Sequence, residues 1–316
     1  MPGASAVVLA LDGDRALRAL PAHHDEMLLS CGMYWHLLTR ALAALGWQVS
    51  RLTCPPSAEL AALPARWRPL ATATFQPAAV EERCFDQLAE LADRRRTNRG
   101  AYLPESIDRE LALIARGAAE PLVSYWTDQP SRRLVAAMMA GDGTRDFTHA
   151  AAWQETYSYL RGTDGAARKR GDGFSVSQLL GSKPRVPSQL VRAALSPTSM
   201  RALSTFGFHR LIAQRMAASI ASAPAILAIS TRSAPDDLAS WLQSGQEVMR
   251  AWLAATTSGI ALHPVSVLIQ HRDLRARLED QLGVTGRLVF LARAGRPVRP
   301  ASSSPRLSLA GRLRTI

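Results

Sequence analysis

The sequence predicts a chain of mixed helix and strand in which helices dominate. Alanine, leucine and arginine are abundant, and all three favour helix. Between the helical stretches lie short apolar runs bounded by turn residues, a pattern typical of strands. With 316 residues, of which 47% are hydrophobic, the chain can bury a large core in one large domain or two smaller ones.

The first ninety residues predict a hairpin, a helix and two further strands. Strands over 6–11 and 15–20 are joined by Asp12-Gly13-Asp14, because Asp-Gly is a strong hairpin signal. The segment Met33 to Leu45 repeats apolar residues at spacings of three and four, which indicates a helix closed by Gly46. The remaining elements expected here are strands at 47–52 and 67–75 and a helix at 80–91.

The rest of the chain predicts more helices and three strands. The expected helices cover 104–116, 132–139, 153–160, 209–222 and 238–257, and the strands cover 122–127, 224–230 and 287–295. Asp236 and Asp237 suit the start of the long helix, and Gly259 suits its end. The segment 162–187 is rich in glycine and proline, so it is expected to be a long loop, either a functional lid or disordered.

The net charge of +12 does not indicate a nucleic-acid binder. Of the 38 basic residues, only Lys169 and Lys183 are lysine, and the arginines are scattered without interleaved aromatic residues or a reader motif. The three cysteines, Cys31, Cys54 and Cys84, are too widely spaced for a zinc site and odd in number, so they are interpreted as core residues. No secretory signal or membrane span is found, and a cytoplasmic protein without bound metal is expected.

An arginine run gives the strongest functional signal. Residues 93–102 read Asp-Arg-Arg-Arg-Thr-Asn-Arg-Gly-Ala-Tyr. Arg95, Thr97 and Arg99 alternate, so after the end of the preceding helix they could converge on one doubly charged oxyanion. A phosphomonoester fits, because forked guanidinium donors match its geometry. The alternative is a solvated charged face.

This run resembles the flavin-phosphate motif of the nitroreductase family, and most closely that of its Acg-like subgroup. Three more segments resemble the subgroup in the same order: Leu29 to Gly32 leading into a helix, Trp241 to Glu247 opening a helix that ends before 258–264, and the strand 287–295 followed by Ser304-Pro305-Arg306. The resemblance covers nearly the whole chain. Acg-like proteins usually carry a Pro-Ser-x-His-Asn-x-Gln-Pro-Trp segment ahead of the first strand, which is not found between Met1 and Ser5.

The resemblance implies an α+β fold with a mostly antiparallel sheet flanked by helices, built from two fused half-domains. Residues 1–92 would form the N-terminal half, and residues 93–316 the C-terminal half with the phosphate motif. It implies FMN as cofactor and NAD(P)H as a possible co-substrate. The implied cofactor-binding residues are Arg95, Arg96, Thr97 and Arg99 at the phosphate and ribityl, Gly259, Ile260 and Ala261 at the ring, and Arg306 closing over the phosphate.

The implied function is an FMN-dependent oxidoreductase that moves electrons between NAD(P)H and an organic acceptor by a ping-pong mechanism. One alternative is a biosynthetic flavin dehydrogenase or oxidase acting on a heterocycle or an alcohol, with oxygen as acceptor. Another is a flavin-sequestering stress protein with little turnover, covered by 162–187. The substrate would be a small molecule, and the protein a monomer with an internal pseudo-dimer or a homodimer. The sequence assigns no catalytic residue; His263 is a candidate donor, whereas His36, Trp241, Gln243 and Trp252 fit core packing better.

Overall fold

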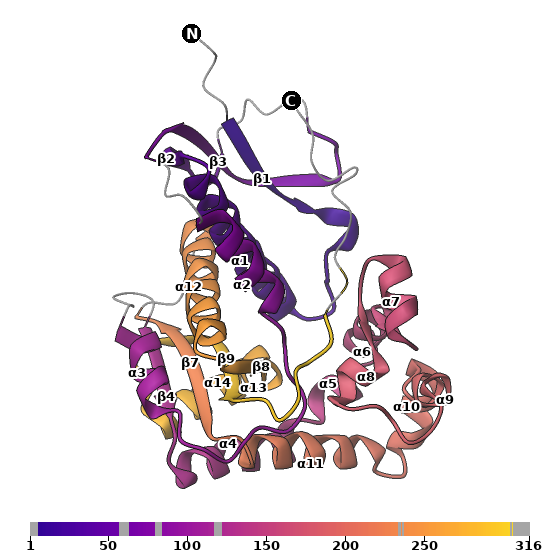
Figure 1. The fold of residues 1–316 in the computed structure, drawn as a ribbon. Coiled ribbons are helices and arrows are strands. Elements are labelled where there is room, and N and C mark those ends of the chain that lie inside the picture. The colour runs from indigo at the N-terminus through magenta and orange to yellow at the C-terminus, as the bar shows by residue number, and fades with distance from the viewer. Residues whose placement is uncertain are drawn as a thin grey trace. The chain divides into compact units, whose positions relative to one another are not determined.

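The computed structural model describes residues 6–56, 63–79, 84–116, 122–232, 235, 237–303 and 305. These residues divide into two compact units (Figure 1). The first holds the described residues up to Arg94 together with those from 235 to 254, and the second holds those from 95 to 232 and from 255 to 305.

The first unit is a small antiparallel sheet with helices. Its strand order is β1 (Ala6–Asp12), β3 (Trp67–Pro77), β2 (Trp47–Thr53), so β3 pairs on both sides. The helices α1 (Pro21–Ala44) and α2 (Cys84–Arg94) pack together, and most of α12 (Leu238–Thr257) belongs to the same unit. The strands expected at 47–52 and 67–75 are confirmed.

The hairpin expected after β1 is wrong. Asp12 instead accepts a hydrogen bond from the backbone of Asp14 and starts a single 3-10 turn, Gly13–Arg15. The Gly13 N–H donates to the Arg66 carbonyl at 2.7 Å, so the chain before β3 takes the place of the expected partner strand. Asp-Gly acts here as a capped turn, because the long-range pairing of β1 with β3 outweighs the local signal.

The first long helix begins earlier than the sequence analysis expected. Pro21 occupies its first turn, where a missing N–H costs nothing, and the helix then runs for 24 residues. The segment Leu29 to Gly32 therefore lies inside α1 and does not lead into it. The apolar repeat from Met33 onward is the second half of this helix.

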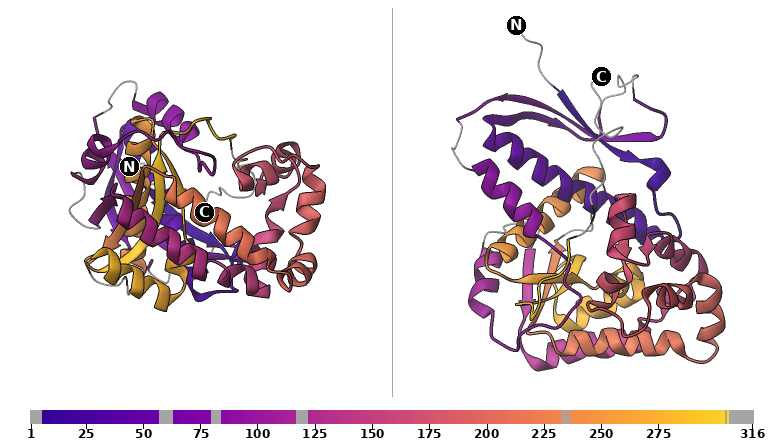
Figure 2. Two further views of the ribbon diagram at one scale, coloured as in Figure 1. Left: turned by 90° about the horizontal axis from the view of Figure 1, so that it is seen from below. Right: turned by 45° about the vertical axis from the view of Figure 1, so that its right-hand side comes forward.

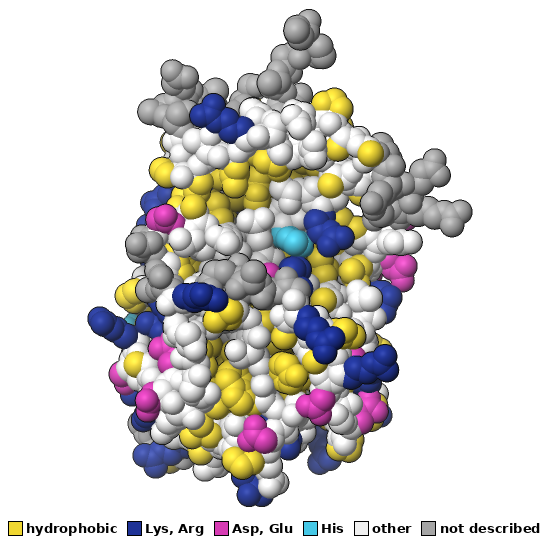
Figure 3. All heavy atoms as spheres, turned by 90° about the vertical axis from the view of Figure 1, so that its left-hand side faces the viewer, with side chains coloured by type: hydrophobic (Ala, Val, Ile, Leu, Met, Phe, Trp, Pro, Cys, Tyr) yellow, Lys and Arg dark blue, Asp and Glu magenta, His cyan; other side chains and the backbone are white. Residues whose placement is uncertain are grey.

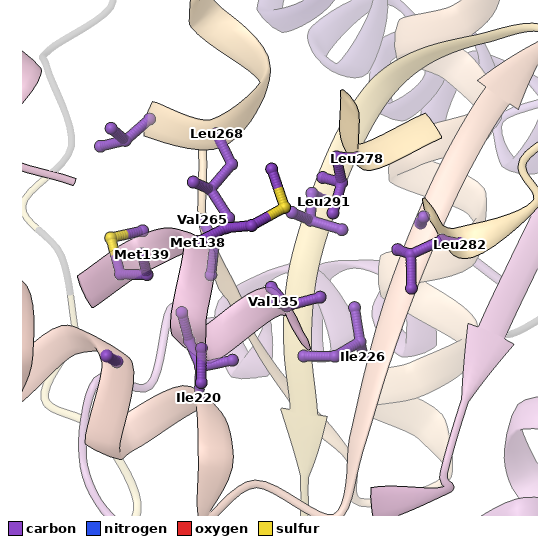
Figure 4. Packing of buried hydrophobic residues seen from close by; sticks show 14 of the residues in the cluster. Val135, Met138, Met139, Ile220, Ile226, Val265, Leu268, Leu278, Leu282 and Leu291 are labelled. Carbon is purple, nitrogen blue, oxygen red and sulfur yellow. The ribbon is translucent and has the colours of Figure 1, made fainter. Parts of the chain in front are cut away.

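The second unit contains a four-stranded antiparallel sheet. Its order is β4 (Leu122–Trp126), β7 (Ala225–Thr231), β9 (Arg287–Gly295), β8 (Ala261–Pro264). The helices α4 (Gln129–Asp142) and α11 (Phe208–Ala221) lie side by side, as Figure 1 shows. Together with α13 (Val267–Gln270) and α14 (Arg272–Leu282) they bury a shared core, whose members include Val135, Met138, Ile226, Leu278 and Leu291 (Figure 4).

A second, smaller core lies among the short helices of the same unit (Figure 2). Its buried members are Trp153, Leu160, Val176, Leu195 and Met200. The elements in this part of the chain are α5 (Arg145–Thr148), α6 (Ala150–Ser158), β5 (Leu160–Arg161), α7 (Asp164–Arg170), β6 (Phe174–Ser175), α8 (Val176–Leu180), α9 (Ser188–Ala194) and α10 (Pro197–Ser204).

The expectation of a long loop at 162–187 is wrong. Two of its glycines and two of its hydroxyl residues cap helices. Thr163 caps α7 and Gly171 ends it, while Ser175 forms a capping box with Gln178 at the start of α8. Short capped helices escape periodicity analysis because they hold too few turns to show a repeat.

The α+β class and the antiparallel pairing are confirmed, with one such sheet in each unit. The helix expected from 104 begins at Asp108 as α3 (Asp108–Arg116), and β8, α9, α10, α13 and α14 are additional elements. The start of the helix expected at 80–91 and Asp236 lie outside the described residues. Among the described helices none is long and apolar enough to cross a bilayer. On the face in Figure 3, basic and acidic side chains are interspersed.

Candidate functional site

The arginine run leaves the helix where the sequence predicted. Arg94 ends α2, and residues 95–103, here called the arginine loop, continue as an extended segment. Thr97 pairs with Leu262 of β8, and the Asn98 N–H donates to the Leu262 carbonyl at 3.1 Å. Farther on, the Leu103 N–H donates to the Arg296 carbonyl at 2.9 Å. The loop is therefore held along the edge of the four-stranded sheet by backbone pairing at both ends.

Asn98 organises the loop from inside. It is 3% exposed, and its Oδ1 accepts from the Gly100 N–H at 2.7 Å, closing a tight turn. Its Nδ2 donates to the Arg299 carbonyl at 3.0 Å, and its own carbonyl accepts from the Tyr102 hydroxyl at 2.9 Å. These bonds fix the backbone that carries Arg99.

Arg293 secures the same turn from the sheet. This residue of β9 is 1% exposed, and its Nη2 donates to the carbonyls of Gly100 at 2.8 Å and Asn98 at 3.4 Å. Its Nε donates to His263 Nδ1 at 2.9 Å, and its Nη1 to the Ser219 carbonyl at 3.2 Å. The guanidinium also lies over the Tyr102 ring, 4.5 Å from the ring centre. No carboxylate is among these described partners.

Arg99 is the second guanidinium of this cluster. Its guanidinium carbon lies 5.6 Å from the centre of the Phe174 ring, and it makes no hydrogen bond or ion pair among the described residues. Burial, and next the charge of Arg293, lower the pKa of Arg99. Arginine stays protonated at neutral pH, so Arg99 keeps a positive charge that no carboxylate contacts among the described residues. The cluster fits an anionic guest.

Gly181 supports the loop from the second small core. It ends α8 with φ of +69°, and a Cβ atom there would lie 2.3 Å from the Arg99 carbonyl carbon and 2.5 Å from the Gly100 nitrogen. Only glycine permits both the left-handed conformation and the close approach. The segment 162–187 thus contacts the arginine loop through Gly181 and Phe174.

The segment Gly259 to Ala261 lies beside the arginine loop, one residue before Leu262. Gly259 ends α12 with φ of +74°, as predicted for a helix C-cap, and it is exposed. Ile260 is buried, its N–H donating to the Ala255 carbonyl at 2.8 Å, whereas Ala261 is half-buried. The exposed glycine backbone could approach a flat ring.

Arg296 holds the backbone just before Gly259 in place. Its Nη1 donates to the Ser258 carbonyl at 2.7 Å, its Nε lies 2.8 Å from Glu105 Oε1, and its Nη2 pairs with Glu110. Arg293 and Arg296 of the β9 region therefore hold two neighbouring segments. Among the described residues, carboxylates contact Arg296 but not Arg293.

The structure brings together most of the predicted cofactor residues. Arg95, Arg96, Thr97 and Arg99 share the arginine loop, half-buried, and Gly259 to Ala261 adjoin it. Arg96 Nη1 donates to the Ala301 carbonyl at 3.1 Å, which ties the loop to the segment after β9. Arg306 lies outside the described residues, so its role stays a prediction.

The expected core packing holds for only part of the set. Trp241 and Trp252 are buried, whereas His36 is half-buried and Gln243 is exposed. His36 Nε2 has no hydrogen-bond partner among the described residues, and burial together with Arg40 and Arg250 lowers its pKa to about 4. Burial raises the pKa of Cys31 to about 11, as expected for an unreactive core thiol.

Sequence reasoning missed Arg293, Asn98 and Gly181. Arg293 had a visible signal, because it is a lone charge inside the apolar run of β9 and a buried charge needs partners. Its partners lie up to 195 positions away, and nothing local identifies them. No group of three or more potential metal ligands occurs among the described residues.

Comparison with known proteins identifies a relative along almost the whole chain. No family model matches. A protein of Serratia sp. (strain ATCC 39006), named Probable NAD(P)H nitroreductase PigM, is 27% identical over 307 residues, which cover 94% of this chain and 82% of the relative. The chain is thus similar over most of its length to a protein named as a nitroreductase. Membership of the fused-half Acg-like subgroup stays a prediction.

Two solved structures align with this chain at low similarity. One is the FMN-dependent nitroreductase NfnB from Mycobacterium smegmatis in complex with NADPH, with 17% identity, 73% of this chain, 99% of that chain and a TM-score of 0.43. The other is the NADPH:FMN oxidoreductase from Vibrio harveyi complexed with NAD+, with 13% identity, 72% of this chain, 76% of that chain and a TM-score of 0.40.

Proposed function

We propose that this chain is an FMN-dependent oxidoreductase that passes electrons from NAD(P)H to a small organic acceptor. The observation that carries the proposal is the half-buried guanidinium of Arg99 beside Arg293, with no described carboxylate to neutralise either. A phosphate would supply the missing negative charge and accept the unused donors of Arg99. The name of the relative PigM supports NAD(P)H as the reductant.

The residues present fit FMN at its anionic end. The arginine loop offers three arginines and the Thr97 hydroxyl, held by Asn98 and Arg293. The exposed backbone of Gly259 lies in the next segment and suits contact with a flat ring. FMN supplies the redox chemistry when bound, while the protein binds and orients it. In the proposed ping-pong order, oxidised nicotinamide leaves before the acceptor enters.

The test is titration of the purified protein with FMN and FAD, followed by anaerobic addition of NAD(P)H. We expect FMN to bind more tightly than FAD, because the motif suits a terminal phosphate, and NAD(P)H to bleach the bound flavin rapidly. Protein that ignores added FMN would contradict the proposal. Bleaching by a specific organic substrate alone would favour the dehydrogenase alternative, and bleaching by dithionite alone the sequestering one.

Arg99→Ala and Arg94→Ala form a matched pair within the same run. Arg94 lies on the surface with Glu90 as its partner, 3.5 Å away, so its removal should change FMN affinity less than twofold. Loss of Arg99 removes a charge-assisted contact, typically worth about 1.5–3 kcal/mol, so affinity should fall about ten- to a hundredfold. If the two variants bind FMN equally well, the arginine run is a solvated charged face and not a phosphate site. Thermal melting checks that both variants fold.

A further inference from the structure

His263 and Arg293 lie opposite each other on two neighbouring strands. The two residues are register partners on β8 and β9, and Arg293 Nε lies 2.9 Å from His263 Nδ1. An arginine Nε–H can only donate, so His263 Nδ1 must be a bare acceptor. A neutral imidazole with a bare Nδ1 carries its proton on Nε2. The pairing therefore selects one tautomer and excludes the doubly protonated ring.

The Nε2–H of His263 remains available to donate a hydrogen bond to a ligand. His263 is half-buried, and Nε2 makes no hydrogen bond to any described residue. The ring lies within electrostatic reach of Arg99: burial, then Arg99, then Arg293 lower the pKa of His263 well below its ordinary value. The charged groups that act on the ring are Arg99 of the arginine loop and Arg293 of β9, and both arginines in turn lie near Tyr102.

We propose that His263 is a binding residue of the Arg99 site, held by Arg293 as a neutral Nε2–H donor to an oxygen that carries negative charge. This inference rests on the proposed function, because the oxygen would belong to FMN. FMN has two kinds of oxygen that fit this description: a phosphate oxygen, and the ring carbonyl oxygen at the edge where reduction places negative charge. A neutral donor adds a hydrogen bond there without a third positive charge beside two arginines.

The first experiment needs no ligand. Long-range proton–nitrogen correlation spectra of the flavin-free wild-type protein, labelled with 15N-histidine, report which ring nitrogen carries the proton. The His263 signals are assigned by their loss in His263→Gln. We expect a protonated Nε2 and a bare Nδ1, unchanged between about pH 8 and pH 5.5, because the ring should not titrate near the ordinary histidine pKa of about 6.5. A proton on Nδ1 would overturn the inference.

The second experiment measures the affinities of FMN and riboflavin for wild type, His263→Ala, His263→Gln and the exposed control His24→Ala. A lost hydrogen bond of about 1–1.5 kcal/mol should weaken binding about tenfold in His263→Ala. Gln keeps an N–H donor and should recover part of the loss, and His24→Ala should match wild type. Loss for FMN alone identifies the phosphate oxygen as the partner, whereas loss for both flavins identifies the ring carbonyl.

Failure of the inference and failure of the proposed function give different results. If the wild-type protein binds FMN and His263→Ala binds both flavins equally well, the inference is wrong and the function stands. If the wild-type protein binds neither flavin, the function and the ligand assigned to His263 fail together, whatever the tautomer. Thermal melting of each variant shows that the comparison is between folded proteins.

Discussion

Gly32 of α1 and Gly245 of α12 face each other with no side chain between them. A Cβ atom on Gly32 would lie 2.9 Å from the Gly245 Cα, and one on Gly245 would lie 2.8 Å from the Gly32 Cα. The Cβ atom on Gly32 would also lie 2.2 Å from the Leu242 carbonyl oxygen, and the one on Gly245 would lie 2.1 Å from the Leu29 carbonyl oxygen. Glycine inside a helix usually costs stability, so both positions are explained by the close crossing of the two helices.

Gly32→Ala should therefore destabilise the protein. Overpacking against backbone typically costs about 1–3 kcal/mol, here outweighing the gain in helix propensity of about 1 kcal/mol. The control is Gly141→Ala in α4, where a Cβ atom meets nothing within 4 Å and stability should hold or rise. Urea unfolding of both variants provides the measurement. A Gly32→Ala protein as stable as wild type would show that the helices separate without cost.

Gly181→Ala should lower the affinity for FMN by more than its effect on the stability of the fold accounts for. The added methyl group meets the Arg99–Gly100 peptide and must displace the arginine loop. Gly207→Ala is the matched control, because Gly207 also has a positive φ, of +80°, but open space around its Cβ position. Both variants carry the left-handed strain of about 1–2 kcal/mol, so only the contact with the loop differs. FMN titration and melting curves separate the two effects, and similar affinities would contradict the prediction.

His36 should make stability fall as the pH drops below neutrality. Its pKa is about 4 in the folded state and about 6.5 when unfolded, so between these values only the unfolded chain binds the proton. Its contribution is absent above pH 7 and destabilises progressively down to about pH 4. Between pH 7.5 and pH 5, the free energy of unfolding should fall by up to about 2 kcal/mol less in His36→Gln than in wild type. Urea unfolding at both pH values measures the difference, and an equal loss in wild type and His36→Gln would contradict the prediction.

The cysteines should be dispensable for turnover. Burial raises the pKa of Cys31 to about 11 and also raises that of Cys54, whose Sγ donates to the Leu70 carbonyl at 3.4 Å. Neither is a thiolate at neutral pH, and the side chain of Cys84 lies outside the described residues. A variant with alanine at all three positions should keep its flavin and its rate while losing some thermal stability. Lost turnover in a variant that still binds flavin would identify a functional thiol.

The parts of this molecule that follow local rules could be predicted from the sequence. The strands β3, β7 and β9 are long apolar runs between turn residues, and α12 combines a periodic apolar face with the Gly259 cap. The arginine run is visible because four arginines and a threonine lie within six residues. Asp237 accepts from the Ser240 N–H at 2.7 Å, as an acidic residue at a helix start should.

The remaining features depend on partners distant in the sequence. Gly13, Gly181 and Arg293 contact residues that are 53, 82 and 195 positions away, and no local pattern encodes these contacts. The glycines of 162–187 were misinterpreted because a glycine that ends a helix and a glycine in a loop look alike in sequence. The tautomer of His263 is likewise set by Arg293, on the next strand of the sheet.

The pairing of Arg99 with Arg293 gives the proposed cofactor a second consequence, outside catalysis. Two guanidiniums held together without a described counter-charge repel each other in the flavin-free chain, and a bound phosphate would relieve that repulsion. Binding to the folded state alone stabilises it by about 2.7 kcal/mol at a hundredfold excess of ligand over Kd. The lifetime of the protein in a cell would then rise and fall with the supply of flavin, so chains made in excess of the vitamin would be the first to be degraded.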